Sequence, residues 1–585
     1  MRAHVVSIVW HNKEPVFGVD TVATDCGVLV ATGGADRVLR LWRFCDGRSD
    51  GRSDGTTAPA PARPAGVTYL CGFARHNGAV NAVRFAPVPA PPAEGDTTTP
   101  SSSNSTNLPL LATASDDGYA IVWRCTGAPD SSSGGSGGRF GCDAEEDSGD
   151  GAARVAALGP AERALLGRAG GWRQWKLVKA PSDVYDLCWS ADGRHLAGAT
   201  TENSVFVAAV ATGAVRVVRE HTHFVQGVAW DPLARLLVSQ SSDQTLRVYA
   251  TPRAGAARPV LRHVVRTLHH HQSQSQEADG GDGGGGDNDS DSDCNGNNSD
   301  NEGERRDEGA EGAEGAEGAA KAGGVSRRLF RSEAAHTFFR RLCWSPDGSL
   351  LVAPAGMFAP PGAAPDAPVA NTAYVFARGA LRQPFLHLPG HRSVVVAARF
   401  SPLLYRLRDV PSSSTGGSSG SHGPAAVPLP YRMVFAVASL DAVVVYDTQA
   451  WHAVAAARRL HLAAITDLAW TPDGQHVLVA SRDGFCSVLS FAPGELGAVL
   501  PPAEHPPVMA DIARARAGTL PDETPRRRPK SAAAAAAAPV PAPPVPAPVA
   551  TAATTKAAAP SNACEQPKRK RIRPMLIPPG QDGST

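Results

Sequence analysis

A unit that recurs seven times is the feature of this sequence that most constrains its fold. In the first half of most units, a short apolar run ends in an aromatic residue before a turn rich in Pro, Asp and Gly; these aromatics are Phe85, Trp189, Trp230, Trp344, Phe400 and Trp470. In the second half, a turn acid precedes a large apolar residue by six positions, as in Asp36–Trp42 and Asp117–Trp123. Short β-rich runs bounded by turn residues predict strands in both halves.

Biased stretches separate the units, and they lie at about 46–66, 88–107, 126–170, 252–326, 405–427 and everywhere after 497. Removing them leaves about 45 residues per unit, the length of a four-stranded propeller blade. A blade cannot bury both faces alone, so seven must stack radially, with the insertions leaving from loops. We therefore predict an all-β, seven-bladed β-propeller over residues 1–496 and a disordered tail, rich in Pro, Ala and basic residues, over 497–585.

The two ends of the repeat region predict how the ring closes. The last unit supplies only three strands, near Ile465–Trp470, Val477–Ser481 and Phe485–Phe491, whereas an orphan strand, His4–Trp10, precedes the first unit. We expect this strand to complete the seventh blade and to leave the ring without an open edge; its predicted closure residues are Val6, Ile8 and Trp10.

Composition explains the biased stretches and excludes some classes of protein. The chain has 59 Gly and 49 Pro with only 6% aromatic residues, so parts of it bury too little apolar surface to fold. A net charge of +1 excludes a uniformly basic nucleic-acid coat. Charge is instead sorted by segment: residues 277–320 carry a net −13 and the tail 525–573 a net +9.

The acidic segment 277–320 has two interpretations that the sequence leaves open. It resembles in charge a polyanion that competes with DNA phosphates for the Lys and Arg of a basic partner, and it is equally compatible with a solvated insertion. Within it, Asp291 to Glu302 satisfies the EF-hand pattern, but neither flank has a helical apolar stripe. We therefore predict no calcium site there.

No pattern in the sequence indicates an enzyme or a bound cofactor. The ten Cys lie far apart without a CxxC pair, so neither a zinc module nor a disulfide framework is expected, and a reducing compartment fits best. His269–His271 form a cluster to which we assign no metal role. We find no phosphate loop, HExxH or nucleophile elbow, and no cluster of titratable groups predicted at the central channel. The N-terminal apolar run is too short for a signal peptide, and the apolar tail is interrupted by prolines, so neither secretion nor membrane contact is expected.

The tail contains a basic run followed by an apolar island. Lys568, Arg569, Lys570 and Arg571 form a nuclear import signal, and 525–530 a weaker one, so we expect nuclear localisation. The apolar island follows within the motif 568–577, and its residues are Arg571, Ile572, Arg573, Pro574, Met575, Leu576 and Ile577.

The repeats resemble WD-repeat propellers, which tie their blades with a His–Asp–Trp pattern of hydrogen bonds. The positions that this resemblance assigns to blade turns are Asp36, Trp42, His76, Asp117, Trp123, His221, Asp243, Tyr249, His391, Asp441, Tyr446, His461 and Asp483. The third unit departs from the pattern, with Glu202 and Ala208 at the Asp and Trp positions, and the fifth lacks a clear turn Asp.

Four longer stretches narrow the resemblance to the middle, WD-repeat subunit of chromatin assembly factor 1: 10–16, 224–233, 338–342 and 429–439. This resemblance implies a non-catalytic histone chaperone subunit acting in replication- and repair-coupled nucleosome assembly. The implied partners are the large and small subunits of that factor, core histones three and four, directly or indirectly, and the anti-silencing histone chaperone, to whose sheet edge the 571–577 motif would add a strand. No specific nucleic-acid sequence is implied. The alternatives are a replication-independent histone regulator and a substrate adaptor of a ubiquitin ligase.

Overall fold

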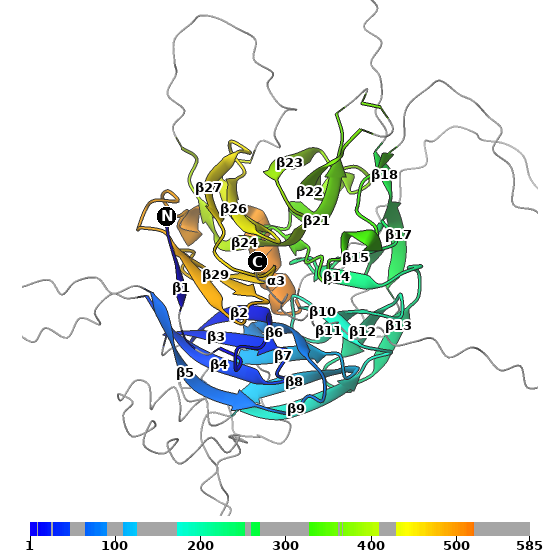
Figure 1. Cartoon of the computed structure of the whole chain (residues 1–585), viewed down its shortest axis with the longest axis vertical. Helices are drawn as coiled ribbons and strands as arrows, with labels where there is room; N and C mark the ends of the chain where they lie inside the picture. Colours follow the sequence, from blue (N-terminus) through cyan, green and yellow to red (C-terminus); the bar gives the residue numbers. More distant parts are fainter. Residues whose placement is uncertain are drawn as a thin grey trace, which may run out of the picture. The chain divides into compact units, whose positions relative to one another are not determined.

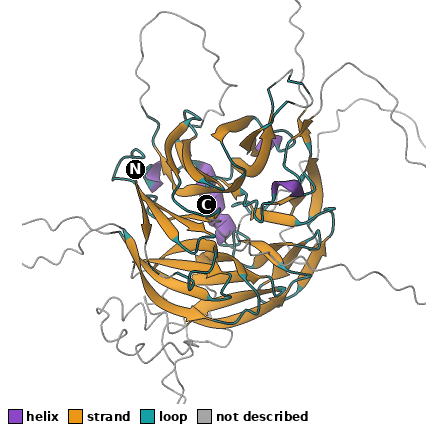
Figure 2. Ribbon diagram, in the orientation of Figure 1, coloured by secondary structure: helices purple, strands orange, loops and turns teal. Residues whose placement is uncertain are grey.

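The alternation of buried and exposed residues in each repeat produces strands, and the strands assemble into seven separate sheets. The computed structural model describes residues 1–6, 8, 10–24, 27–46, 65–89, 109–125, 172–251, 259–268, 327–360, 363–364, 367–408 and 429–519. Within these residues, each blade is one antiparallel four-stranded sheet, with its strands in sequence order in every blade but the last, whose fourth strand is the N-terminal β1. Figure 2 shows that strands make up nearly all of the ring.

The first four blades use strands β2 to β17. Blade 1 consists of β2 (Val16–Thr24), β3 (Gly27–Gly34), β4 (Leu39–Cys45) and β5 (Gly66–Phe73). Blade 2 consists of β6 (Val80–Pro89), β7 (Pro109–Ser115), β8 (Tyr119–Cys125) and β9 (Trp172–Lys179). Blade 3 consists of β10 (Val184–Trp189), β11 (His195–Thr200), β12 (Val205–Ala209) and β13 (Val215–Val218). Blade 4 consists of β14 (Val225–Trp230), β15 (Leu236–Ser241), β16 (Leu246–Ala250) and β17 (Val260–Val265).

The remaining blades use strands β20 to β30 and β1. Blade 5 consists of β20 (Cys343–Trp344), β21 (Leu350–Phe358), β22 (Ala370–Ala377) and β23 (Leu386–His391). Blade 6 consists of β24 (Val395–Tyr405), β25 (Arg432–Ser439), β26 (Ala442–Asp447) and β27 (Ala453–Arg458). Blade 7 consists of β28 (Ile465–Trp470), β29 (His476–Ser481), β30 (Cys486–Ser490) and β1 (Arg2–Val6). A small sheet pairs β18 (Thr267–Leu268) with β19 (Arg327–Arg328), and the helical segments are η1 (Glu333–Ala335), η2 (Arg378–Ala380), η3 (Pro502–Glu504) and α3 (Pro507–Arg516).

The first strand of each blade lies innermost and packs against the first strand of the next blade. These contacts run around the whole ring, and β28 of blade 7 returns to β2 of blade 1. Burial follows the same order, since β28 is buried throughout whereas the outer strand β27 is mostly exposed. Apolar clusters lie between neighbouring blades, so each blade buries its faces only by stacking. The prediction of an all-β, seven-bladed propeller is confirmed (Figure 1).

The ring closes through the N-terminal strand, at a different register from the one predicted. β1 pairs antiparallel with β30, from Arg2 opposite Ser490 to Val6 opposite Cys486. Of the three predicted closure residues, only Val6 lies in the strand. Ile8 and Trp10 lie after it, because the backbone turns at once: the Ile8 N–H donates to the Val6 carbonyl at 2.9 Å.

Trp10 nevertheless fixes this turn by packing rather than by pairing. Its side chain is fully buried, and its indole Nε1 donates to the Val6 carbonyl at 3.2 Å. The ring lies against Trp42 of blade 1, with the centroids 4.7 Å apart. Arg40 donates to the Trp10 carbonyl at 2.9 Å. The closure segment is therefore anchored to blade 7 by β1 and to blade 1 by Trp10.

Folded structure extends into five stretches that were predicted to be insertions or tail. Two of these overlaps are short, because β5 begins at Gly66 and β6 ends at Pro89. β17 and β18 lie within the predicted insertion 252–326, and β17 is the outer strand of blade 4. Blade 6 begins with β24, which ends at Tyr405. Beyond residue 496, the chain forms η3 and α3, and the compact unit extends to Asp522. Polar or proline-rich composition concealed these elements because a few buried apolar residues are enough to dock each one.

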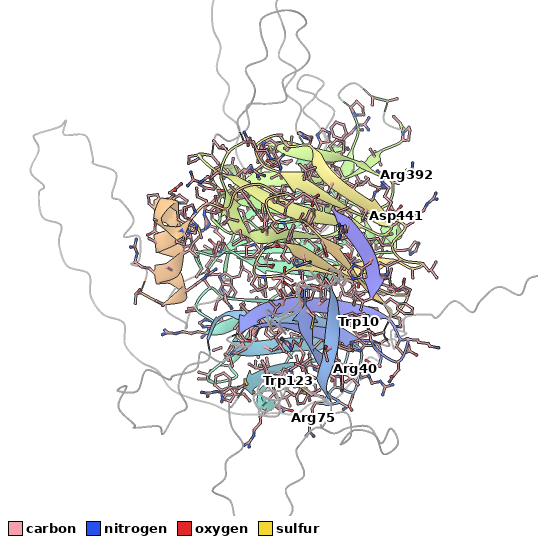
Figure 3. The ribbon with its side chains drawn as sticks, turned by 90° about the vertical axis from the view of Figure 1, so that its left-hand side faces the viewer. Trp10, Arg40, Arg75, Trp123, Arg392 and Asp441 are labelled. Atoms are coloured by element: carbon pink, nitrogen blue, oxygen red, sulfur yellow. The ribbon has the colours of Figure 1, made fainter. Side chains whose placement is uncertain are left out.

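The segment after blade 7 crosses one face of the ring. Val499 pairs with Tyr405 of blade 6, whereas Ile512 and Ala515 of α3 pack against Ala191 and Leu233. These last two residues belong to the turns between the first and second strands of blades 3 and 4. Figure 3 shows α3 at one side of the ring, away from the labelled Arg392 and Asp441. No helix among the described residues is long and apolar enough to span a membrane.

Candidate functional site

Blade 2 shows how the predicted turn residues hold a blade together. His76, in the loop before the first strand, joins its Nδ1 to Asp117 Oδ2 at 2.9 Å and its Nε2 to Thr113 Oγ1 at 2.8 Å. Trp123 then donates from its indole Nε1 to the same Thr113 hydroxyl at 2.9 Å. Loop, turn and two strands of the blade are thus connected by one buried chain of hydrogen bonds.

Blade 1 forms the same network around a histidine that was not predicted from the sequence. His11 Nδ1 lies 2.7 Å from Asp36 Oδ1, and His11 Nε2 lies 2.8 Å from Thr32 Oγ1. Trp42 donates to Thr32 at 2.8 Å, and Arg40 adds an ion pair with Asp36. His11 could have been found from its position ahead of the turn acid Asp36. The long β2–β3 hairpin places the two residues 25 positions apart, whereas His221 and Asp243 are 22 apart.

Blade 4 keeps the network with serine and tyrosine substitutions. His221 Nδ1 lies 2.8 Å from Asp243 Oδ2, and its Nε2 lies 2.7 Å from Ser239 Oγ. Tyr249 occupies the tryptophan position and is buried.

Blade 7 keeps the histidine–aspartate pair but moves the second hydrogen bond to another strand. His461 Nδ1 lies 3.0 Å from Asp483 Oδ2, and its Nε2 lies 2.9 Å from Ser487 Oγ. Val479 takes the position that Thr32 holds in blade 1, so the serine on β30 provides the hydroxyl.

In blade 6 the predicted residues do not form this network. His391 Nε2 lies 3.1 Å from the Tyr446 hydroxyl, and its Nδ1 has no hydrogen-bond partner. Asp441 instead accepts hydrogen bonds from Ser393 and Ser439. The turn is one residue shorter than in the other blades, and this places the carboxylate outside the reach of the imidazole. The prediction that Asp441 would pair with His391 is therefore wrong.

Burial sets the protonation of these pairs. Burial lowers the pKa of His11 and of His221, outweighing the aspartate beside each. The carboxylates behave oppositely. Burial is the largest single effect and would raise the pKa of Asp36, Asp117 and Asp483, but the hydrogen bond and charge of the histidine, together with backbone N–H donors, outweigh burial and lower this pKa. A neutral imidazole beside a charged carboxylate suits a structural tie.

The centre of the ring holds a cluster of buried charges that was not predicted from the sequence. Arg84 of β6 joins Asp467 of β28 at 2.7 Å and Asp186 of β10 at 3.2 Å. Arg399 of β24 joins Asp467 at 3.1 Å. Asp20 of β2 accepts the backbone N–H groups of Phe85 and Thr21. These side chains come from the innermost strands of five blades, so opposite charges meet across the channel.

Arg341, which precedes β20, occupies the middle of this cluster. Its Nη1 donates to Asp186 at 2.7 Å, and its Nη2 donates to the carbonyls of Phe17 and Asn81 at 3.0 and 2.7 Å. Its Nε donates to the Thr466 carbonyl at 3.2 Å. One guanidinium from blade 5 thus connects blades 1, 2, 3 and 7.

The cluster remains ionised despite its burial. Burial would raise the pKa of Asp467, but Arg341, Arg84 and Arg399 outweigh it and lower the pKa to about 2. Burial lowers the pKa of Arg341 to about 10, which still leaves it charged at neutral pH. Asp20 differs, because burial raises its pKa.

The signal for this cluster was present in the repeat itself. Arg84 and Arg399 come one residue before the aromatic that ends the first strand, and Asp186, Arg341 and Asp467 come three residues before it. Residues two apart on a strand share a face, so both positions face the channel. Paired in this way, the charges satisfy one another. Among the described residues, no group of three or more His, Cys, Asp or Glu side chains could hold a metal ion.

The predicted import signal and the 571–577 motif lie outside the described residues. So do the acidic segment 277–320, the EF-hand pattern and His269–His271.

Seven four-stranded sheets in a closed ring, four of them with a histidine–aspartate tie between loop and turn, define a WD-repeat β-propeller. A WD domain, G-beta repeat, matches residues 213–250, and the CAF1B/HIR1 beta-propeller domain matches residues 314–496. The B subunit of chromatin assembly factor 1 from Mus musculus is 30% identical over 517 residues, which cover 87% of this chain and 70% of that protein. The chromatin assembly factor 1 subunit FAS2 homolog of Oryza sativa subsp. japonica is 31% identical over 508 residues, which cover 85% of this chain and 74% of that protein. The chain belongs to this family, the B subunits of chromatin assembly factor 1.

Protein HIR1 of Yarrowia lipolytica also matches, at 24% identity over 518 residues, but these cover only 38% of that protein.

Proposed function

We propose that this chain is the WD-repeat scaffold subunit of a histone chaperone complex and supports nucleosome assembly coupled to DNA replication and repair. The observation that carries the proposal is similarity to the mouse B subunit of chromatin assembly factor 1 along 87% of the chain. The match runs over 517 residues, so the similarity extends well beyond the short repeat signature. The partners are the large and small subunits of that factor, with histones three and four bound directly or through them, and the site of action is the nucleus.

The propeller's role in this proposal is non-catalytic. The buried charges at its centre satisfy one another, as Asp467 does with Arg84, Arg341 and Arg399. The histidine–aspartate pairs likewise use their polar atoms in hydrogen bonds that connect the loop and the turn of one blade. A rigid ring of this kind supplies surfaces on its faces and rim, which is what a scaffold requires.

The tail supplies the second part of the proposal. The described part of the chain ends at residue 519, shortly after α3, and residues 571–577 follow later in the sequence. We propose that this motif adds a strand to the sheet edge of the anti-silencing histone chaperone. Backbone pairing would provide affinity and alternate side chains specificity.

A role as a replication-independent histone regulator is the second candidate. The matching domain is shared with HIR1, which favours this interpretation, but identity to the HIR1 of Yarrowia lipolytica is lower and the match covers 38% of that protein. No ligase-docking element supports a ubiquitin-ligase adaptor.

Affinity purification from nuclear extract, followed by mass spectrometry, tests the proposal. We expect recovery of the large and small assembly-factor subunits, and recovery of regulator subunits in their place would contradict it. The double variant Ile572→Ala with Arg573→Ala should lose the anti-silencing chaperone but keep the other subunits, because each anchor of this type contributes about 2 kcal/mol or more. Unchanged recovery of that chaperone would refute the motif assignment alone.

A further inference from the structure

The outer strand of blade 2, β9 (Trp172–Lys179), differs in charge from every other outer strand described. It carries three basic residues, Arg173, Lys176 and Lys179, and no acid, in the sequence WRQWKLVK. The other six outer strands, β1, β5, β13, β17, β23 and β27, each carry at most one Lys or Arg. Positive charge on the rim of the ring is therefore concentrated on this strand.

The basic side chains of β9 are exposed and available. Arg173 and Lys179 are exposed, and Lys176 is half-buried. Within the described part of the chain, none of the three forms an ion pair with a carboxylate. An acidic partner would therefore meet cations that no described carboxylate neutralises.

Two apolar side chains lie among these charges. Leu177 is 51% exposed, although it belongs to a regular strand. Trp175 is the extra residue of a β-bulge, because Trp123 pairs with Gln174 while the preceding Val122 pairs with Lys176. The half-buried indole packs against the apolar cluster between blades 2 and 3. β9 thus presents an apolar strip together with its charges.

Cations flank the indole of Trp175. The Arg124 guanidinium carbon lies 5.5 Å from the ring centroid, and the Lys176 ammonium nitrogen lies 5.7 Å from it. Such contacts hold the long side chains over the ring and reduce the freedom they would lose on binding. The cationic groups are therefore partly organised for a ligand.

The backbone of β9 has one free side. The sheet of blade 2 runs β6-β7-β8-β9, and no described strand pairs with the outer edge of β9. Alternate N–H and C=O groups along that edge point outward, as required for pairing with another extended chain.

We propose that the outer edge of β9 binds an extended, acidic segment of a partner protein by strand addition. Main-chain pairing supplies affinity, carboxylates of the segment meet Arg173, Lys176 and Lys179, and an aliphatic side chain covers Leu177. Nucleic acid fits less well, because a phosphate backbone leaves both the unpaired strand edge and the exposed Leu177 without a partner. Basic residues can also serve only to prevent edge pairing, and the experiment separates these roles.

The test uses the full-length chain and three fluorescent probes: a peptide of about 12 residues alternating Glu and Val, the same peptide with a central Pro, and a DNA duplex of about 20 base pairs. Fluorescence anisotropy should show salt-sensitive binding of the first peptide only, because proline removes a backbone donor and breaks the pairing. Reversing two charges with Arg173→Glu and Lys176→Glu should weaken binding roughly tenfold or more. Hydrogen exchange should slow at residues 172–179 when the peptide is bound.

Matched variants control the result. Arg458→Glu, on the outer strand of blade 6, places the same charge reversal on another edge and should leave binding unchanged. Melting temperature confirms that the β9 variants fold. Absence of peptide binding, equal binding of the proline peptide, or no response to the β9 variants would each overturn the proposal. Preferential binding of DNA that the β9 variants abolish would also overturn it and assign the surface to nucleic acid.

Discussion

Replacing Arg341 by Met tests whether the buried charge cluster holds the ring together. Met fills much of the same volume but removes the guanidinium that joins blade 5 to Asp186 and to the carbonyls of Phe17, Asn81 and Thr466. Asp467 keeps Arg84 and Arg399, whereas Asp186 keeps only longer contacts, with Arg84 at 3.2 Å and with the Val228 N–H at 3.3 Å. The variant therefore leaves a buried carboxylate and three buried carbonyls short of a donor.

The expected loss is about 3–5 kcal/mol, the range for breaking a buried ion pair on one side. The pKa of Asp467 agrees in direction, because its basic neighbours, Arg341 first among them, lower it to about 2 despite burial. Unfolding entropy for the roughly 340 described residues converts the loss into a fall of about 4–7 °C in melting temperature.

Intrinsic tryptophan fluorescence during heating measures this fall. Adding Asp186→Asn to Arg341→Met should recover about 1–2 kcal/mol, because it removes the uncompensated charge. Arg341→Lys should fall between the wild type and Met, since lysine keeps the charge but cannot donate in four directions. A melting temperature of Arg341→Met within about 1 °C of the wild type would refute the reasoning.

Three further predictions concern other parts of the ring. In Gly227→Ala, the new Cβ would lie 1.8 Å from the Arg340 carbonyl oxygen, so we expect a strongly destabilised chain, whereas Gly66→Ala, where nothing lies within 4 Å, should melt like the wild type. Burial lowers the pKa of His391 from 6.5 to about 4, so as the pH falls the His391 imidazole is protonated in the unfolded chain before it is protonated in the folded one. The contribution of the neutral imidazole to the free energy of unfolding is therefore complete above pH 6.5, and about 3 kcal/mol of it is lost by pH 4. The melting temperature of His391→Gln should therefore fall less than that of the wild type between these pH values, and parallel curves would contradict it. Deleting residues 1–12 removes β1, Trp10 and His11 and exposes the edge of β30; light scattering should show oligomers, and a monomer that melts cooperatively would show that closure does not depend on this segment.

The fold could be predicted from the sequence because the repeat can be recognised within each unit, without knowing which other residues that unit contacts. In most units an aromatic residue ends the first strand, and a turn acid precedes a large apolar residue by six positions. Counting these units gives the number of blades directly. The errors in the predicted element boundaries arise where a single tertiary contact decides whether a residue belongs to a strand or a helix. Trp10 leaves the closing strand because it is buried against Trp42, and α3 docks through little more than Ile512 and Ala515.

The candidate sites were less predictable for a different reason. His76–Asp117 follows from the repeat, but the absence of an Asp441–His391 pair depends on one missing residue in a turn. The charge cluster needs all seven strands placed together, since Arg84 meets Asp467 across 383 residues of sequence. Spacing within a unit carries no information on such long-range pairs.

Because β1 pairs with β30, the ring cannot close during synthesis until the ribosome has made β30. Val6 emerges first, yet its partner Cys486 is synthesised 480 residues later. At about 5–20 residues per second, the first strand waits about 25–100 s for the last blade. During that time six blades can assemble while the leading end of the nascent chain stays unpaired, so chaperones that shield an exposed strand would act on this chain before its synthesis is complete.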